Sequence, residues 1–348
     1  MSLIEYLKSL VQYPALLLTS LLTLAVIFVN GWTDAPNAIA TCVSTRALPP
    51  KKAIYMAAIC NFLGLAFMTM INVAVAETIT HMVDFGSNTQ EALIALCAAM
   101  VAIVLWASLA SVFGIPTSES HALIAGLSGA AIAMHNSLEG ISKAEWLKVL
   151  FGLFFSTILG FVLGLLVTKT LESLFRNANR QKANAFFKKA EIFGGASMAF
   201  VHGAQDGQKF LGVFLLGVAL IKGNTGGEQT VIPLWLMLLC ALVMGIGTSI
   251  GGMKIIRSVG MDMVRLDYYQ GFAADIVSSF CILLSTLFGL PVSTTHVKTS
   301  AIMGTGAAKG MKRVNWSVVK DMVGTWILTF PLCTLVGYVI TKCFIWIF

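Results

Sequence analysis

Long apolar runs separated by short polar segments fill most of this chain. The runs are about 20 residues long, the length that a helix needs to cross a bilayer. They lack the alternation of apolar and polar residues that marks the strands of a membrane β-barrel. Hydrophobic residues make up 57% of the chain and charged residues 11%, whereas soluble domains have roughly 25% charged residues. The pattern predicts an all-α, multi-pass protein of the cell membrane, in contact with lipid.

The apolar runs predict about ten to twelve helices. Ten runs suggest crossings at 14–45, 53–76, 92–113, 114–134, 146–168, 192–221, 231–252, 268–288, 289–308 and 316–348. If the fourth and ninth segments re-enter the membrane instead of spanning it, the number of crossings falls. The first and sixth runs carry polar, Gly or Pro residues in their middle, so we expect both helices to be broken at membrane depth, near Asp34 and within Gly203–Lys209.

Two polar motifs each occur twice, in the same order. One reads Asn30-Gly-Trp-Thr-Asp-Ala-Pro-Asn37 and His202-Gly-Ala-Gln-Asp-Gly-Gln-Lys209; the other reads Gly114-Ile-Pro-Thr-Ser-Glu-Ser-His121 and Gly289-Leu-Pro-Val-Ser-Thr-Thr-His296. The copies lie 172 and 175 positions apart. Such spacing indicates an internal duplication, with a first membrane repeat at 1–171, a basic linker at 172–190 and a second repeat at 191–348.

Lysine and arginine gather in segments that the predicted crossings place on one side of the membrane. These segments are 46–52, 172–191, 254–265 and 309–313, and the positive-inside rule assigns them to the cytoplasm. Each half then has an odd number of crossings, so the halves are inverted. Inverted repeats with broken helices are typical of secondary transporters, whose substrate binds near the midplane. The net charge of +7 reflects these loops, and we expect no nucleic-acid partner.

The Gly-x-Pro-x-Ser motifs predict an anion site. Proline suits the first turn of a helix and a neighbouring Ser or Thr can cap it, so each motif should open a helix whose N-terminus attracts an anion. Two such ends approaching from opposite sides can hold one oxyanion. The predicted substrate-binding residues are Thr117, Ser118, Ser120, Ser293, Thr294, Thr295 and Lys209.

Asp34 and Asp206 predict a coupling site for a cation. A carboxylate at membrane depth is costly and usually functional, and beside an anion site it must be neutralised by H⁺, Na⁺ or a divalent metal. The side chains of Asn37, Gln205 and Gln208 add neutral oxygen donors. A salt bridge with Lys209 or Lys298 is the structural alternative for these carboxylates. The two lysines either contact the anion or pair with Asp206 and Asp275.

His121 and His296 follow the Ser/Thr clusters. Each histidine either relays protons or bonds the anion, or is a packing residue. Two histidines in separate repeats without cysteine partners are a poor zinc signature. We therefore expect no cofactor apart from the coupling ion, H⁺ or Na⁺, with Asp34 and Asp206 as the ligands of any metal.

The four motifs resemble those of the inorganic phosphate transporter (PiT) family, over nearly the whole chain. The resemblance implies an inverted-repeat fold, cation-coupled phosphate symport and a homodimer. It places Asp34, Asn37, Asp206 and Gln208 in the cation and substrate region, and the Ser/Thr clusters around phosphate. The family usually has Asn-Asp in two motifs where this chain has Thr33-Asp34 and Gln205-Asp206.

The ending at Lys209 is similar to the bacterial low-affinity branch, which implies protons and neutral metal–phosphate complexes. Our hypothesis is therefore phosphate import by alternating access, coupled to H⁺ in preference to Na⁺. The alternatives are a permease for sulfate or another oxyanion, or a passive anion channel. An intramembrane enzyme built on Ser118 and His121 is the weakest alternative, so we expect no enzymatic activity.

Overall fold

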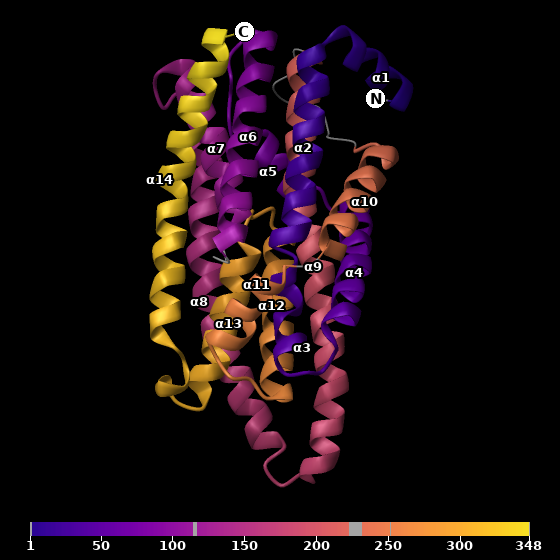
Figure 1. Cartoon of the computed structure of the whole chain (residues 1–348), viewed down its shortest axis with the longest axis vertical. Helices are drawn as coiled ribbons and strands as arrows, with labels where there is room; N and C mark the ends of the chain where they lie inside the picture. The colour runs from indigo at the N-terminus through magenta and orange to yellow at the C-terminus, as the bar shows by residue number, and fades with distance from the viewer. Residues whose placement is uncertain (1, 114–116, 223–231, 251, 348) are drawn as a thin grey trace.

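The computed structural model describes residues 2–113, 117–222, 232–250 and 252–347 as a bundle of α-helices (Figure 1). The helices are α1 (Leu3–Gln12), α2 (Pro14–Thr33), α3 (Pro36–Ser44), α4 (Pro50–Ile71), α5 (Ala74–Thr80), α6 (Thr89–Phe113), α7 (Glu119–His135), α8 (Lys143–Leu174), α9 (Arg180–Lys222), α10 (Leu234–Ile250), α11 (Met253–Arg257), α12 (Tyr268–Leu287), α13 (Thr294–Ala308) and α14 (Trp316–Ile347).

The Gly-x-Pro segments are not among the helices long enough to span, which favours the re-entrant alternative and a number of crossings below ten. Seven helices of the described ranges are long and apolar enough to span, or eight if the bent pair of 234–250 and 253–262 counts as one span. Helices α7 and α13 have only 17 and 15 residues. At 1.5 Å per residue, a helix of 17 residues reaches roughly 26 Å, less than the roughly 30 Å of the hydrocarbon core.

Each of these short helices instead forms a hairpin with the helix before it. Helices α6 and α7 meet near mid-height of the bundle, and so do α12 and α13, the two hairpins coming from opposite ends (Figure 1). Gly289 lies between α12 and α13 with φ 66°, in the left-handed region that suits glycine. The equivalent Gly114 lies outside the described residues. The hairpins are the re-entrant alternative that the sequence left open.

One of the two predicted helix breaks is present. Helix α2 ends at Thr33 and α3 begins at Pro36, so Asp34 lies in the break as expected. Helix α9, by contrast, runs without interruption from Arg180 to Lys222, so the expected break within 203–209 is wrong. The first copy of the motif has Pro36, which lacks an N–H and cannot continue a helix, whereas the second has Gln208 at the corresponding position.

The two halves are interleaved through matched helix pairs. Helix α7 packs along α14 of the other half, and α13 packs along α8. Glycine permits both close approaches: a Cβ at Gly129 would lie 2.1 Å from the Thr334 carbonyl oxygen, and one at Gly304 would lie 2.1 Å from that of Phe161. The two glycines are 175 positions apart, as the histidines are. Packing therefore repeats the duplication that the motifs show.

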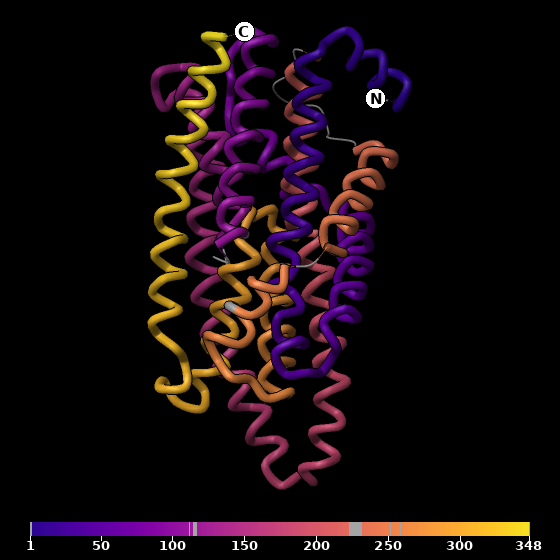
Figure 2. The backbone as a smooth tube through the Cα atoms, in the orientation of Figure 1, coloured from indigo at the N-terminus to yellow at the C-terminus, as the bar shows by residue number. Residues whose placement is uncertain are grey.

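The duplicated aspartate motifs lie on helices of opposite direction. Helix α2 descends from the end of the bundle that holds both termini, and α9 rises toward that end (Figure 2). The expected linker at 172–190 is not a separate segment. It consists of the last turn of α8, the first turns of α9 and the short connection between them, and it projects from the opposite end (Figure 1).

Apolar side chains cover the outer faces of the long helices. Phe151, Phe154 and Ile158 on α8 are 59–64% exposed, and Ile327 and Leu335 on α14 are similarly exposed. A soluble protein rarely exposes so continuous an apolar surface, whereas lipid covers it at no cost. Polar residues concentrate instead at the bundle centre, between the hairpin tips and the aspartate motifs.

Candidate transport site at the bundle centre

Asp34 and Asp206 lie side by side in the buried centre of the bundle. The hydroxyl of Thr294, in the first turn of α13, is 3.4 Å from Asp34 Oδ2 and 3.2 Å from Asp206 Oδ2. Both carboxylates are at most 2% exposed. The tip of the second hairpin therefore touches both copies of the aspartate motif.

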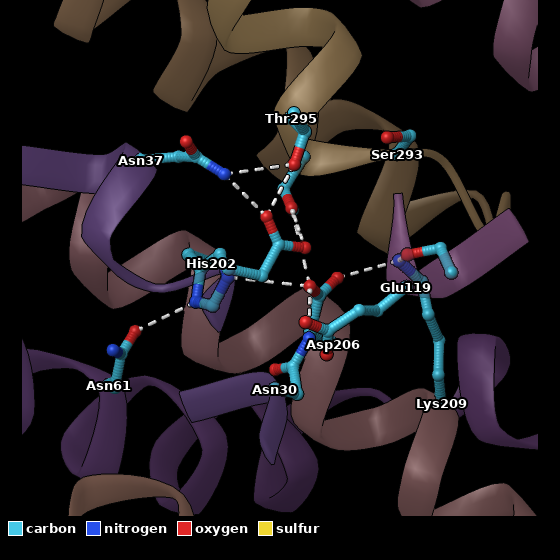
Figure 3. Close-up of polar contacts among 12 residues, drawn as sticks. Asn30, Asn37, Asn61, Glu119, His202, Asp206, Lys209, Ser293 and Thr295 are labelled. Atoms are coloured by element: carbon cyan, nitrogen blue, oxygen red, sulfur yellow. Dashed lines mark hydrogen bonds and ion pairs between the residues drawn. The ribbon is translucent and has the colours of Figure 1, made fainter. Parts of the chain in front are cut away.

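Asp34 is held by neutral donors only, as far as the described residues show. Asn37 Nδ2 donates to Asp34 Oδ1 at 2.7 Å, and the Thr295 hydroxyl donates to the same oxygen. Asn37 Nδ2 also lies 3.1 Å from Thr295 Oγ1 (Figure 3). Asn37 is the second residue of α3, so the break at Pro36 places its amide next to Asp34. A buried carboxylate with neutral partners lacks a counter-charge.

Asp206 does have a counter-charge. Lys209 Nζ lies 2.6 Å from Asp206 Oδ1, and its other partners are Ser120 Oγ at 2.5 Å and the Val292 carbonyl oxygen at 2.6 Å. Asn30 Nδ2 donates to Asp206 Oδ2 at 3.3 Å. Of the alternatives for Lys209, the structure contains the ion pair. Since Ser120 and Val292 belong to the two hairpin segments, the ammonium joins both of them to α9.

His202 is a site residue that the sequence analysis did not single out. Its Nε2 lies 3.4 Å from Asp206 Oδ2, and its Nδ1 lies 3.0 Å from Asn61 Oδ1 (Figure 3). Asp34, His202 and Asp206 each offer a ligand atom within 4.8 Å of the others. Two carboxylates and an imidazole suit a divalent metal ion. The duplication offered a signal, because His202 occupies the position of Asn30 in the repeated motif.

The Ser residues of both hairpin motifs cap helices as predicted. Ser118 Oγ accepts from the His121 N–H and Ser293 Oγ accepts from the His296 N–H, each at 3.2 Å. The proline is not in the first helical turn, however: Pro291 precedes the cap Ser293 by two residues, and α13 begins at Thr294. Pro116 lies outside the described residues. The two capped N-termini, with their free N–H groups, face the buried centre.

The family model described as "Phosphate transporter family" matches residues 30–337 of the chain. The chain belongs to this family. It is therefore a multi-pass membrane transporter of phosphate and not an enzyme, as the motifs indicated.

Proteins with similar sequences match this chain over nearly its full length. A "probable low-affinity inorganic phosphate transporter" of Bacillus subtilis is 37% identical, the match covering 92% of this chain and 96% of the relative. One of the same description from Rhizobium meliloti is 34% identical over 92% of this chain and 94% of its own. A solved structure, "The sodium-dependent phosphate transporter", superposes with a TM-score of 0.85 at 21% identity over 96% of this chain and all of the other. That likeness shows that the fold is shared.

Within this phosphate transporter family member, the paired histidines lie among aromatic rings. His121 and His296 contact each other edge to face, with ring centroids 4.4 Å apart. His121 also stacks on Phe330 and His296 on Trp326, both of α14. Neither ring nitrogen of His121 has a hydrogen-bond partner in the described part of the chain. The arrangement fits packing, while a role in proton transfer stays a prediction.

The two glutamines of the second aspartate motif contact the backbone near the hairpin and α4. Gln205 Nε2 donates to the Leu290 carbonyl at 2.8 Å, and Gln208 Nε2 donates to that of Asn72 at 2.7 Å. These two hydrogen bonds hold α9 to the backbone before α13 and to the C-terminal end of α4. Thr117 is buried beside the cap of α7. Glu119, in the next turn, accepts a hydrogen bond from the Thr33 hydroxyl and links the first hairpin to α2.

Proposed function

We propose that this transporter imports inorganic phosphate together with protons, the phosphate arriving as a complex with a divalent metal ion. The observation that supports this most strongly is the unequal state of two neighbouring carboxylates. Asp206 is paired with Lys209, whereas the donors to Asp34 within the described ranges are the neutral groups of Asn37, Thr294 and Thr295. A buried charge without compensation is expensive. Asp34 is thus the group that needs a mobile cation.

The imidazole of His202 favours a divalent metal as part of the cargo. Asp34, His202 and Asp206 supply nitrogen and oxygen ligands within reach of one ion. A metal ion there carries positive charge toward the capped ends of α7 and α13, where phosphate would bind. Phosphate bound to a metal ion brings less charge into the membrane centre than free phosphate does, which lowers the cost of desolvation.

Cation and phosphate binding are coupled through shared hydroxyl groups. Thr294 and Thr295 now donate to the carboxylates. A metal ion or proton that takes those carboxylate oxygens releases the hydroxyls, which are then free to donate to phosphate. The affinity for phosphate is therefore low before the cation binds and high after the cation has bound. The hydroxyls of Ser118 and Ser293 accept from backbone N–H groups, so their protons stay available for phosphate.

Sodium coupling is the second candidate, because Asp34 and the neutral groups around it offer oxygen ligands that suit a hard cation. Against it stands the imidazole of His202 beside Asp206, a ligand that favours transition metals. A sulfate permease would use the same helix ends. A passive channel would not require the two carboxylates.

Uptake of radiolabelled phosphate into proteoliposomes tests the proposal. An inward proton gradient and an inward sodium gradient are imposed separately, each with Mg²⁺ or with EDTA, and with sulfate as competitor. We expect phosphate to accumulate only under the proton gradient. EDTA should abolish this accumulation, and sulfate should not inhibit it. Accumulation driven only by sodium, or uptake indifferent to EDTA, would overturn the coupling scheme. Equilibration without accumulation would indicate a channel.

A further inference from the structure

A second buried polar cluster lies between the central site and the basic end of the bundle. We call it the lower cluster; its members are Thr41 and Thr45 of α3, Glu191 of α9, Asp275 of α12 and Lys298 of α13. Lys298 Nζ donates to Asp275 Oδ1 and lies 3.3 Å from Thr41 Oγ1. The Thr41 hydroxyl is 2.7 Å from Asp275 Oδ1, and the Thr45 hydroxyl is 2.9 Å from Glu191 Oε2.

Glu191 is the unbalanced member of the lower cluster. Its side chain has no exposed surface, and its Oε1 has no hydrogen-bond partner among the described residues. That oxygen faces α12, since a Cβ at Gly271 would lie 1.9 Å from it, one turn before Asp275. The titratable groups facing Glu191 are Asp275, Lys298 and the thiol of Cys42. The ammonium of Lys298 is already bound to Asp275, so Glu191 has no counter-charge of its own.

One face of α3 joins this cluster to the central site. Asn37, Thr41 and Thr45, the last at the C-cap of α3, follow at spacings of four residues, which places them in a row along the helix. Asp34, in the break before α3, accepts from Asn37 and so links the row to the central site. The row passes from fully buried side chains at the centre to the half-buried Thr45. From Asn37 to Thr45 it covers about 12 Å along the axis, at 1.5 Å per residue. The next residue, Arg46, is exposed and belongs to the basic, cytoplasmic segment at 46–52.

The fold does not require charges here: the counterpart of Glu191 at the offset of 172 is the neutral Thr19, and three further counterparts are apolar. The counterparts of Thr41, Asp275 and Lys298 at the repeat offsets are Val213, Met100 and Leu123. All three are fully buried members of the apolar core around the first hairpin. Apolar residues are thus sufficient for helix packing around the first hairpin, whereas the matching places around the second hairpin contain buried charges. A costly feature confined to one half points to a function on that side.

We propose that the lower cluster is the cytoplasmic proton exit of the transporter, with Glu191 as the group that takes up and releases the proton. This deepens the proposed function and rests on it. When the site opens inward, the proton leaves the central site on the water admitted there, which exchanges O–H bonds with the hydroxyls of Thr41 and Thr45. It forms an O–H bond at Glu191 Oε1, and that bond breaks when the proton passes to cytoplasmic water.

The Asp275–Lys298 pair fixes the middle of the route. Its ammonium lies at the middle of the row, bonded to Asp275 and near Thr41. The pair is neutral overall, so it does not itself supply or take up the proton. A proton moves by exchanging O–H bonds between hydroxyls and water, whereas a sodium or divalent ion would have to pass as a whole between side chains that are fully buried. The metal and phosphate would leave the central site by another path.

The test compares net uptake with exchange in proteoliposomes of the full chain. Net uptake under a proton gradient requires deprotonation on the inner side, whereas phosphate exchange at equal pH and equal phosphate does not. Glu191→Gln keeps the shape of the side chain but cannot carry the proton. We expect net uptake to fall about 100-fold, the scale of a lost proton-transfer group, and exchange to stay near the wild-type rate. Glu191→Asp should recover much of the net uptake.

Two controls make the result interpretable. Glu139→Gln makes the same change at an exposed position near the opposite end and should alter neither rate. If Glu191→Gln does not reach the membrane, Thr45→Val removes the hydroxyl that holds Glu191 and should slow net uptake more than exchange. Unchanged net uptake, or equal loss of uptake and exchange, would overturn the exit route. If net uptake by the wild-type protein does not depend on the proton gradient, the proposed proton coupling itself is refuted.

Discussion

The two copies of the aspartate motif differ in charge and in shape. The first copy is broken at Pro36, and its Asp34 is surrounded by neutral donors. The second is part of the continuous helix α9, and its Asp206 is bound to Lys209. The position of Asn37 in one copy is that of Lys209 in the other. One carboxylate thus has a tethered cation, and in the proposed mechanism the other exchanges its cation with the solution.

The largest expected effect comes from removing either carboxylate. Under the proposed mechanism, Asp34→Asn eliminates the group that needs a mobile cation and Asp206→Asn removes a metal ligand; each should reduce phosphate uptake about 100-fold or more, a loss of roughly 2.7 kcal/mol. The two variants should differ in stability, however. Asp206→Asn leaves the buried Lys209 unpaired, which costs about 3–5 kcal/mol, while Asp34→Asn should leave the melting temperature in detergent nearly unchanged.

The double variant Asp206→Asn with Lys209→Gln separates the two effects. It removes the stranded ammonium, so it should recover much of the melting temperature without recovering uptake. Normal uptake in Asp34→Asn would refute the view that this carboxylate carries the coupling cation.

Making the second copy resemble the first in shape should be the next most damaging change. Gln208→Pro inserts the residue that breaks the first copy, and it removes a helical hydrogen bond within α9 at a cost of about 3 kcal/mol. We expect a lower midpoint in denaturing detergent titrations, followed by circular dichroism. The matched change Pro36→Ala should cost much less, because the break at Asp34 is also held by Asn37 and Thr295. Equal effects would show that proline does not explain the difference between the copies.

Making the second copy resemble the first in charge should have a smaller effect. Lys209→Asn replaces the tethered cation with an amide, so Asp206 must find a mobile cation as Asp34 does. Uptake should fall about tenfold, or 1.4 kcal/mol, and its dependence on cation concentration should become steeper. Uptake measured against Mg²⁺ and Na⁺ concentration checks this, with Lys209→Arg as the control that keeps the charge. An unchanged cation dependence would contradict the idea of a tethered cation.

The smallest predicted effects concern the helix caps. Ser118→Ala and Ser293→Ala each remove one N-cap, worth about 1 kcal/mol, and one hydroxyl that phosphate would accept from. We expect the KM for phosphate to rise several-fold in both variants, by similar factors, in initial-rate uptake. Replacement by Thr should restore it. A large effect in only one variant would mean that the two hairpins bind phosphate unequally.

The sequence was informative where a single residue dictates local geometry. Pro36 marked the break that exposes Asp34, and Ser118 and Ser293 were identified as caps from their place in the motif. The expected break in α9 was wrong because the argument relied on glycine. Gly203 and Gly207 instead allow α4 to approach closely: a Cβ on them would collide with Asn61 and Leu65.

Pairings between distant segments were beyond sequence reasoning. Lys209 had an anion and a carboxylate as equally plausible partners, and only the position of α9 beside both hairpins decides between them. The lower cluster was invisible for the same reason, since Thr41, Glu191 and Lys298 come from three separate helices. The depth of the hairpins was also open, because segments of 15 and 17 residues are close to the length of a crossing.

The exchange of helix partners between the halves has a consequence for biosynthesis. Helix α7 is made well before α14, along which it packs. The first hairpin, with its polar tip, must therefore wait in the bilayer or at the insertion machinery until α14 has been made. Contacts between such distant segments slow folding and leave partly folded intermediates exposed. Chains that stop before α14 should be recognised as unfinished and degraded, which protects the cell from a half-built ion pathway.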